Sequence, residues 1–451
     1  MEEVRVEERM EHIASLLAEK NYKQLKIELE DMYPVDIAEA FEDLNNDECI
    51  LLFRLLQKDL AAEVFSYLSA QRRKDVVSGI HTDLLKHILD ELYFDDKIDF
   101  LEEMPANFVK DLLKESTVEE RKLINQFLHY PENSAGSLMT IEYVDLKRNM
   151  TVQQALKRIK EIGMEKETVY TCYVLDPTRR LIGIVSLRQL VLADENSLIE
   201  DIMDTEVVLA QTGDDQEEVA ELFKKYDLMV IPVVDAEHRL IGIITIDDIV
   251  DVIEQENTED FQKMAAISPS DEAYLDMSPV ALTKKRIVWL MLLMISAMFT
   301  AKIITHFEEL LSSAVALAAY IPMLMDTGGN SGSQTSTTVI RGMALGEVEL
   351  SDWAKVLWKE ARIGVMAGVL LAVVNFGRMM LLESGNLNVA ITVSVTLICT
   401  VLLAKLIGGL LPIGARALKL DPAIMASPII TTVVDAIALA IYFSLASALV
   451  L

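Results

Sequence analysis

The sequence predicts a multidomain membrane protein with an all-α N-terminal domain, an α/β middle region and an α-helical transmembrane domain of five spans. The first observation is an abrupt change in charge. Of 71 acidic and 41 basic residues, 10 and 9 lie from Ile287 onward, so the 286 residues before it hold 61 acids and 32 bases. Their formal charge is −29, against −1 for the remainder. The second observation is a set of long apolar stretches after Ile287, and the third is an internal repeat before it.

Residues up to about 130 are predicted to be helical. Leu52, Leu56, Leu60, Val64 and Leu68 recur every four residues, and other short periodic runs surround them. Short helices stacked as hairpins would form a small solenoid-like bundle.

The acidity of the first 286 residues narrows the choice of partners. Such an excess of negative charge repels nucleic acid and favours cations. A surface that is acidic only to stay soluble has the same composition, so the charge alone does not indicate a cation site.

The middle region contains an internal repeat. Arg180-Leu181-Ile182-Gly183-Ile184-Val185-Ser186 returns 59 residues later as Arg239-Leu240-Ile241-Gly242-Ile243-Ile244-Thr245. Each unit is predicted to be strand, turn, strand and helix, with an earlier helix at Val152–Ile162 or Gln216–Tyr226. The doubled pattern resembles a tandem pair of cystathionine-β-synthase (CBS) modules.

The CBS resemblance implies an adenine nucleotide as one cofactor. It points to Tyr170, Arg188 and Thr245 as residues for ATP. In the second module Thr245 is followed by Asp247-Asp248, as expected, whereas the first has Gln189 where an acid would hold the ribose. An empty, purely structural pair therefore remains the alternative.

Five stretches in the C-terminal part are about long enough to cross a bilayer. They are Ile287–Ile304, Ser312–Ile340, Ile363–Leu382, Val389–Leu411 and Pro422–Leu451. The predicted domains are accordingly 1–130, 131–256, a connecting helix at 257–285, and a transmembrane domain at 286–451.

The short loops predict the orientation in the membrane. Lys284-Lys285-Arg286 precedes the first span, whereas the loops Thr305–Leu311 and Glu383–Asn388 hold acids and no Lys or Arg. The positive-inside rule then places the N-terminus in the cytoplasm and the C-terminus outside a bacterial inner membrane.

Asp435 is the strongest functional candidate because it lies well inside the last span, and ionisable residues there are costly. A structural alternative would pair it with Lys405 or Arg378, but both lie nearer span ends and are expected to reach the membrane surface.

The second span carries a polar stripe. Asp326, Asn330 and Gln334 recur every four residues and so share one helical face, which suits a hydrated cation path. The neighbouring glycines are explained by close helix packing. Carboxylate, amide and hydroxyl oxygens favour Mg²⁺, Ca²⁺ or Mn²⁺ over Zn²⁺ or Cu⁺.

With these motifs in place, the whole chain resembles the MgtE family of bacterial magnesium channels. The most specific parts are Gly329-Asn330-Ser331-Gly332-Ser333-Gln334 and Thr431-Thr432-Val433-Val434-Asp435. The resemblance implies a homodimer in membrane lipid, Asp435 as the central pore ligand, and a long helix from about Thr258 to Thr283 that closes the pore.

The resemblance also implies that cytosolic Mg²⁺ closes the channel by binding carboxylates at domain and subunit contacts. The metal-ligand candidates, with the pore residues first, are Asp435, Asn330, Asp95, Asp96, Glu217, Asp227, Asp248, Glu256, Glu259 and Asp260. Packing such acids together is unfavourable unless cations neutralise them.

Two other functions remain open. One is a secondary transporter that couples Mg²⁺ to Na⁺ or H⁺, and the other is a membrane-anchored nucleotide sensor built on the CBS pair. No phosphate loop, paired nucleophile and base, or metal-hydrolase spacing indicates an enzyme.

Overall fold

The computed structural model describes residues 12–13, 15–42, 44–270, 274–275, 277–313, 315–382, 387–425 and 427–450. Part of one loop used above to predict orientation, residues 383–386, lies outside this set. Contacts divide the chain into two compact units, one ending at Ile253 and the other beginning at Glu254.

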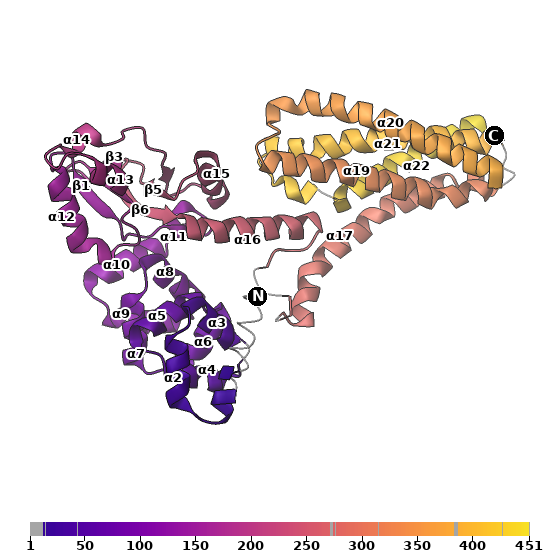
Figure 1. Ribbon diagram of the computed structural model, residues 1–451. Helices are drawn as coiled ribbons and strands as arrows, with labels where there is room; N and C mark the ends of the chain where they lie inside the picture. The colour runs from indigo at the N-terminus through magenta and orange to yellow at the C-terminus, as the bar shows by residue number, and fades with distance from the viewer. Residues whose placement is uncertain are drawn as a thin grey trace. The chain divides into compact units, whose positions relative to one another are not determined.

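The first unit begins with short helices joined by tight turns (Figure 1). They are α2 (Tyr22–Glu30), α3 (Pro34–Glu42), α4 (Asn46–Phe53), α5 (Lys58–Tyr67), α6 (Ala70–Gly79), α7 (Thr82–Glu91), α8 (Phe94–Glu103), α9 (Ala106–Glu115) and α10 (Val118–Phe127). The all-helical prediction is confirmed. The four-residue periodicity from Leu52 to Leu68 does not belong to one helix, because α4 ends before Leu56 and α5 begins after it.

A line of aromatic rings forms the centre of this helical part. Phe41, Phe53, Phe65 and Phe100 meet edge to face, with successive ring centroids 6.4, 6.2 and 5.3 Å apart. All four side chains are fully buried, so the helices are fixed mainly by apolar burial.

Two equivalent α/β modules follow. The first contains α11 (Ala135–Leu138), β1 (Val144–Lys147), α12 (Val152–Ile162), the 3-10 helix η1 (Gly163–Glu165), β2 (Thr171–Leu175), β3 (Leu181–Ser186) and α13 (Leu187–Leu192). The second contains α14 (Ile199–Ile202), β4 (Ala210–Gln211), α15 (Gln216–Tyr226), β5 (Val230–Val234), β6 (Leu240–Thr245) and the first part of α16 (Ile246–Met264).

Each module has a three-stranded sheet in which the first strand is parallel to the second and the second antiparallel to the third. The repeat predicted from sequence is confirmed: α12 and α15 have the expected bounds. Thr171 pairs with Ser186 in one sheet as Val230 pairs with Thr245 in the other, so the two strand–helix junctions are equivalent.

The expected continuous helix over 257–285 is not formed. Helix α16 ends at Met264, Ala266 adopts a left-handed backbone conformation (φ 54°), and the amide of Ile267 donates to the carbonyl of Gln262. This closes the helix end in the usual way. The next helix starts with Pro279, which is favourable at a first helical position.

The second unit is a bundle of long helices (Figure 1). Its elements are α17 (Pro279–His306), α18 (Glu308–Ser313), η2 (Val315–Tyr320), α19 (Ile321–Ala344), η3 (Leu350–Asp352), α20 (Trp353–Leu382), α21 (Leu387–Ala417), η4 (Pro422–Met425) and α22 (Ser427–Leu449).

Within the described residues, four segments are long and apolar enough to span a membrane: Pro279–His306, Leu350–Leu381, Leu387–Ala417 and Pro422–Leu449. Helix α19 is more polar and packs against α21 and α22. The chain therefore has a helical membrane domain, and the count of five spans remains a prediction.

Candidate functional site

The polar side chains of α19 lie on one exposed face of the helix, as the sequence predicts. Asp326, Asn330 and Gln334 are exposed on one face, while Thr335 and Ser336 on the other side are buried. The Asn330 Nδ2 donates to the Asp326 Oδ1 at 3.1 Å. One face of α19 therefore carries carboxylate and amide oxygens that no apolar side chain covers.

Asp435 lies next to this stripe, on α22. Its side chain is half-buried, and its Oδ1 is enclosed without a hydrogen-bond partner in the described part of the chain. The carboxylates of Asp435 and Asp326 are close enough to repel each other. Because an unpaired buried carboxylate oxygen is costly, this arrangement favours a cation near both groups.

The glycines of α19 make this neighbourhood by allowing α22 to approach. A Cβ at Gly329 would lie 2.8 Å from the Cγ2 of Thr431, which is closer than real Cβ atoms come. Thr431 is one helical turn before Asp435, so close packing at Gly329 holds this part of α22 against α19, with the Asp435 carboxylate near that of Asp326. Both predicted roles, packing by glycine and a polar face, are thus present on one helix.

Lys405 and Arg378, the alternative partners considered for Asp435, form hydrogen bonds with other residues. The Lys405 Nζ donates to the Thr335 hydroxyl at 3.3 Å, and the Arg378 Nη2 donates to the Asn375 Oδ1 at 3.2 Å. Lys405 is 7% exposed, so the expectation that it reaches the membrane surface is wrong for this chain. The reason is close packing of α19 and α21 around it.

A second group of carboxylates gathers in the first unit, between α8, the first module and the start of α16. We name as the Asp95 cluster the residues Asp95, Asp96, Asp99, Glu167, Asp247 and Asp248. Burial, and then repulsion by Asp248 and Asp96, holds the pKa of Asp95 well above its usual value.

Three further acids of the Asp95 cluster, Asp99, Glu167 and Asp248, also have raised pKa values. Burial, followed by repulsion from neighbouring carboxylates, raises the pKa of Asp99 to about 7 and that of Glu167 to about 8. Burial also raises the pKa of Asp248 to about 6, although its carboxylate accepts a bond from the Thr245 hydroxyl at 2.9 Å. The folded unit therefore concentrates negative charge where it is unfavourable.

The sequence predictions include Asp95, Asp96 and Asp248 but miss Asp99, Glu167 and Asp247. Asp99 lies one helical turn after Asp95 and Asp96 on α8, a spacing that the sequence does show. No local signal marks Glu167, because it joins the cluster only when the first module packs beside α8.

A third group lies in the second unit, and we name it the Lys263 cluster: Glu256, Glu259, Asp260, Lys263 and Asp421. The Lys263 ammonium forms ion pairs with Glu259, one turn away on α16, and with Asp421 at 2.7 Å. Burial, and then Asp421, raises the pKa of Asp260 to about 6. The predicted ligands Glu256, Glu259 and Asp260 are thus together, with a lysine among them.

The two remaining predicted ligands, Glu217 and Asp227, lie at the two ends of α15. Glu217 lies exposed in the first turn of α15, and Asp227 is the exposed residue that ends the same helix, with φ 50°. Across the described residues, no three His, Cys, Asp or Glu side chains form a closed metal site within one chain.

The residues predicted for ATP lie at the strand–helix junctions. The carbonyl of Tyr170 accepts a bond from the amide of Leu187, which places the exposed Tyr170 beside the exposed Arg188. Thr245 holds the equivalent place in the second module, where it is buried and bonded to Asp248.

The chain matches three family models. They are MgtE, described as a divalent cation transporter, over residues 321–445, the MgtE intracellular N domain over 32–133, and the CBS domain over 135–196 and 199–255.

Similar proteins cover nearly the full length. The magnesium transporter MgtE of Thermus thermophilus is 38% identical over 436 residues, 95% of this chain and 96% of that protein. The protein of the same name from Bacillus subtilis is 30% identical over 442 residues, 97% and 96% of the two chains.

Two solved structures resemble the N-terminal half. The cytosolic domain of the Mg²⁺ channel MgtE in complex with ATP is 36% identical with a TM-score of 0.52, and covers 53% of this chain and 98% of that one. The soluble part of a magnesium transporter is 30% identical with a TM-score of 0.51, and covers 56% and 99%. Together with the site geometry, these matches establish that the chain belongs to the MgtE family of divalent cation transporters.

Proposed function

We propose that this chain forms a homodimeric channel that carries Mg²⁺ across the inner membrane of a bacterium. One observation carries the proposal: the unpaired Oδ1 of Asp435 lies beside the exposed carboxylate and amide face of α19. The names of the full-length relatives, magnesium transporters, support Mg²⁺ as the ion.

The chemistry of this face suits a hydrated ion. Mg²⁺ gives up its water reluctantly and is usually bound through few carboxylates and several waters. Asp326, Asn330 and Asp435 offer oxygens without His or Cys, so they would contact the hydration shell of Mg²⁺ and disfavour softer metals.

The exposure of this face supports a dimer. Asp326, Asn330 and Gln334 are exposed in a single chain, although lipid is a poor environment for them. A second copy would cover the face and bring two Asp435 carboxylates to one path. In the proposed orientation the N-terminus is cytoplasmic and the C-terminus is outside.

The acidic clusters support self-gating. Cytosolic Mg²⁺ would neutralise the predicted ligands in the N domain, the modules and α16, and so stabilise a compact, closed state. Ions that bind one state preferentially shift the population toward it. At low Mg²⁺ the carboxylates repel, and the closed state loses this stabilisation.

We also propose ATP as a ligand of the first module, at Tyr170 and Arg188. The solved cytosolic domain of a relative is a complex with ATP, which supports this. Thr245 is a weaker candidate because its hydroxyl already donates to Asp248.

Growth of a transport-deficient bacterium tests the pore assignment. Expression of the wild type should restore growth in low Mg²⁺, whereas Asp435→Ala at equal expression should not, because the path loses its central carboxylate. Glu347→Ala removes an exposed acid of the same domain and should behave as the wild type. Growth restored by Asp435→Ala would remove Asp435 from the mechanism.

Recordings from planar bilayers separate a channel from a coupled transporter. A channel gives unitary current steps in Mg²⁺, whereas an exchanger gives Mg²⁺ flux without them. Steps in the wild type that disappear in Asp435→Ala would support the proposed channel.

A further inference from the structure

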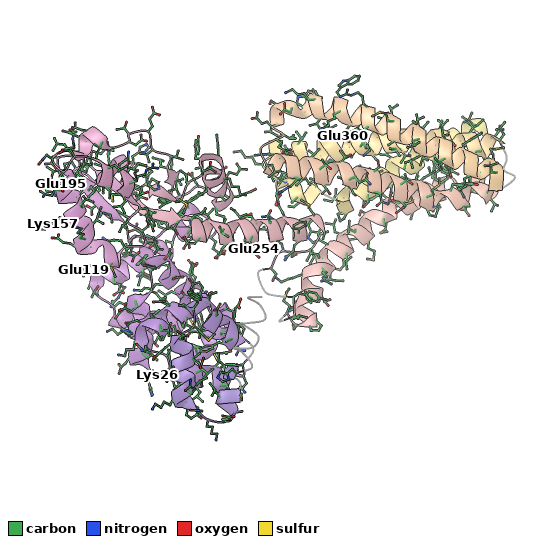
Figure 2. The ribbon with its side chains drawn as sticks, viewed as in Figure 1. Lys26, Glu119, Lys157, Glu195, Glu254 and Glu360 are labelled. Atoms are coloured by element: carbon green, nitrogen blue, oxygen red, sulfur yellow. The ribbon has the colours of Figure 1, made fainter. Side chains whose placement is uncertain are left out.

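Three helices of the membrane domain meet at a buried row of polar side chains. Thr335 on α19, Glu360 on α20 and Lys405 on α21 are 3, 9 and 7% exposed; Figure 2 labels Glu360 on its helix. The Thr335 hydroxyl donates to the Glu360 Oε2 at 2.8 Å, and the Lys405 Nζ donates to the same hydroxyl at 3.3 Å. One hydroxyl therefore connects a buried acid to a buried base.

Small residues bring these groups together. A Cβ added at Gly408 would lie 2.4 Å from the carbonyl oxygen of Gly332, so α19 and α21 cross there with their backbones nearly in contact. Gly408 follows Lys405 by three residues, and Gly332 precedes Thr335 by three. The crossing thus encloses Lys405 between helices, where its ammonium remains away from bulk water.

The buried row lies close to the proposed ion path without being part of it. At 3.6 residues per turn, Thr335 is rotated by about 140° from Asn330, so the two side chains leave α19 on nearly opposite sides. About one helix diameter, ~10 Å, separates the row from the polar face. In a medium of low dielectric constant, a charge at that distance still acts strongly on an ion.

We infer that Glu360 neutralises Lys405 through Thr335 and thereby keeps the path of α19 favourable for divalent cations. This inference rests on the proposed function. Without Glu360, the fixed positive charge of Lys405 would repel ions in the path. Glu360 is in this sense a positioning and specificity-determining residue that does not touch the ion.

An unneutralised charge on Lys405 would change ion flux in a way that a packing defect alone does not. Electrostatic work on an ion scales with its valence, so the factor by which a fixed charge lowers Mg²⁺ flux is the square of the factor for a monovalent ion. A tenfold loss for Mg²⁺ would accompany a loss of about threefold for Na⁺. A general loss of folded protein would lower both fluxes equally.

The test uses full-length protein in liposomes, with Mg²⁺ influx and Na⁺ influx in divalent-free buffer as the two readouts. Glu360→Gln keeps an acceptor for Thr335 and removes the charge, and we expect about a tenfold loss of Mg²⁺ flux and about threefold for Na⁺. The double variant Glu360→Gln with Lys405→Met removes both charges and should restore Mg²⁺ flux to within about twofold of the wild type. Lys359→Met, on the exposed side of α20, is the matched control and should change neither flux.

Lys405→Met alone provides a second variant should Glu360→Gln fail to fold. It removes the repelling charge and leaves the Thr335–Glu360 bond, so Mg²⁺ flux should stay at or above the wild-type value. Equal losses of Mg²⁺ and Na⁺ flux in Glu360→Gln, no recovery in the double variant, or a tenfold loss in Lys405→Met would overturn the inference. A wild type without Mg²⁺ flux would instead overturn the proposed function, and the inference with it.

Discussion

The Asp95 cluster and the Lys263 cluster are both groups of crowded carboxylates, but they are neutralised differently. In the Lys263 cluster an ammonium group of the chain itself lies between Glu259 and Asp421. In the Asp95 cluster the Arg73 guanidinium lowers the pKa of Asp96 and Asp99, but it only partly offsets the effect of burial. Protons or free cations must supply the remaining positive charge there.

This difference identifies where a cation should act. A group that already holds a lysine gains less from an added ion than a group without one. Stability and gating should therefore respond to Mg²⁺ mainly through the Asp95 cluster, with the Lys263 cluster as the internal reference.

The largest expected effect is on gating. The double variant Asp95→Asn with Asp248→Asn removes two carboxyl groups that could bind a cation, so the conductance of the purified protein should change little between micromolar and about 10 mM internal Mg²⁺. The wild type should lose most of its conductance over the same range.

Glu63→Gln neutralises an exposed acid of the same domain and is the control for this variant. If the double variant closed with Mg²⁺ as the wild type does, the Asp95 cluster would have no part in gating.

The next effect is on pH dependence. The pKa values of Asp248, Asp99 and Glu167 in the folded chain, about 6, 7 and 8, lie above the ordinary carboxyl values. The folded state therefore binds more protons than the unfolded state, and stability falls as pH rises through this range. Added Mg²⁺ should raise the melting temperature by about 5 °C at pH 8.5 and hardly at all at pH 5.5.

Thermal unfolding of the full-length protein in detergent, with Mg²⁺ or with a chelator, measures this effect. A gain from Mg²⁺ that is equal at both pH values would show that the ion does not replace protons on these carboxylates.

The smallest expected effect is on stability, and it concerns the Lys263 cluster, which serves as the internal reference. Lys263→Met leaves Glu259, Asp260 and Asp421 without their ammonium, and should lower the melting temperature in chelator by about 2 °C, because the pairs are only partly buried. Mg²⁺ should then stabilise the variant more than the wild type.

Lys157→Met breaks the exposed i,i+4 pair with Glu161 and serves as the matched control. An equal response to Mg²⁺ in both lysine variants would mean that Lys263 does not stand in for a cation.

Much of the fold and part of the site could be predicted from local sequence. The bounds of α12 and α15 follow from periodicity, and the repeated strand pairs follow from the doubled motif. The shared face of Asp326, Asn330 and Gln334 depends only on the 3.6-residue turn of a helix. Asp435 could be selected because a carboxylate inside an apolar span is costly wherever the span packs.

Other features are decided by which segments meet in the folded chain. Glu167 joins Asp95 and Asp248 from another element, and Asp421 reaches Lys263 from far along the sequence. The break after Met264 replaced an expected continuous helix. Sequence periodicity cannot report these contacts, because it describes one helix at a time.

Lys405 shows most clearly which properties the sequence determines and which only the tertiary structure decides. The sequence by itself determined that a lysine lies within an apolar span, and from this we expected its ammonium at the membrane surface. Only the tertiary structure decided its burial, because Gly332 and Gly408 bring two backbones into contact and Glu360 comes from a third helix. Helix periodicity is a property of neighbouring residues, whereas the environment of a charge depends on every helix that packs around it.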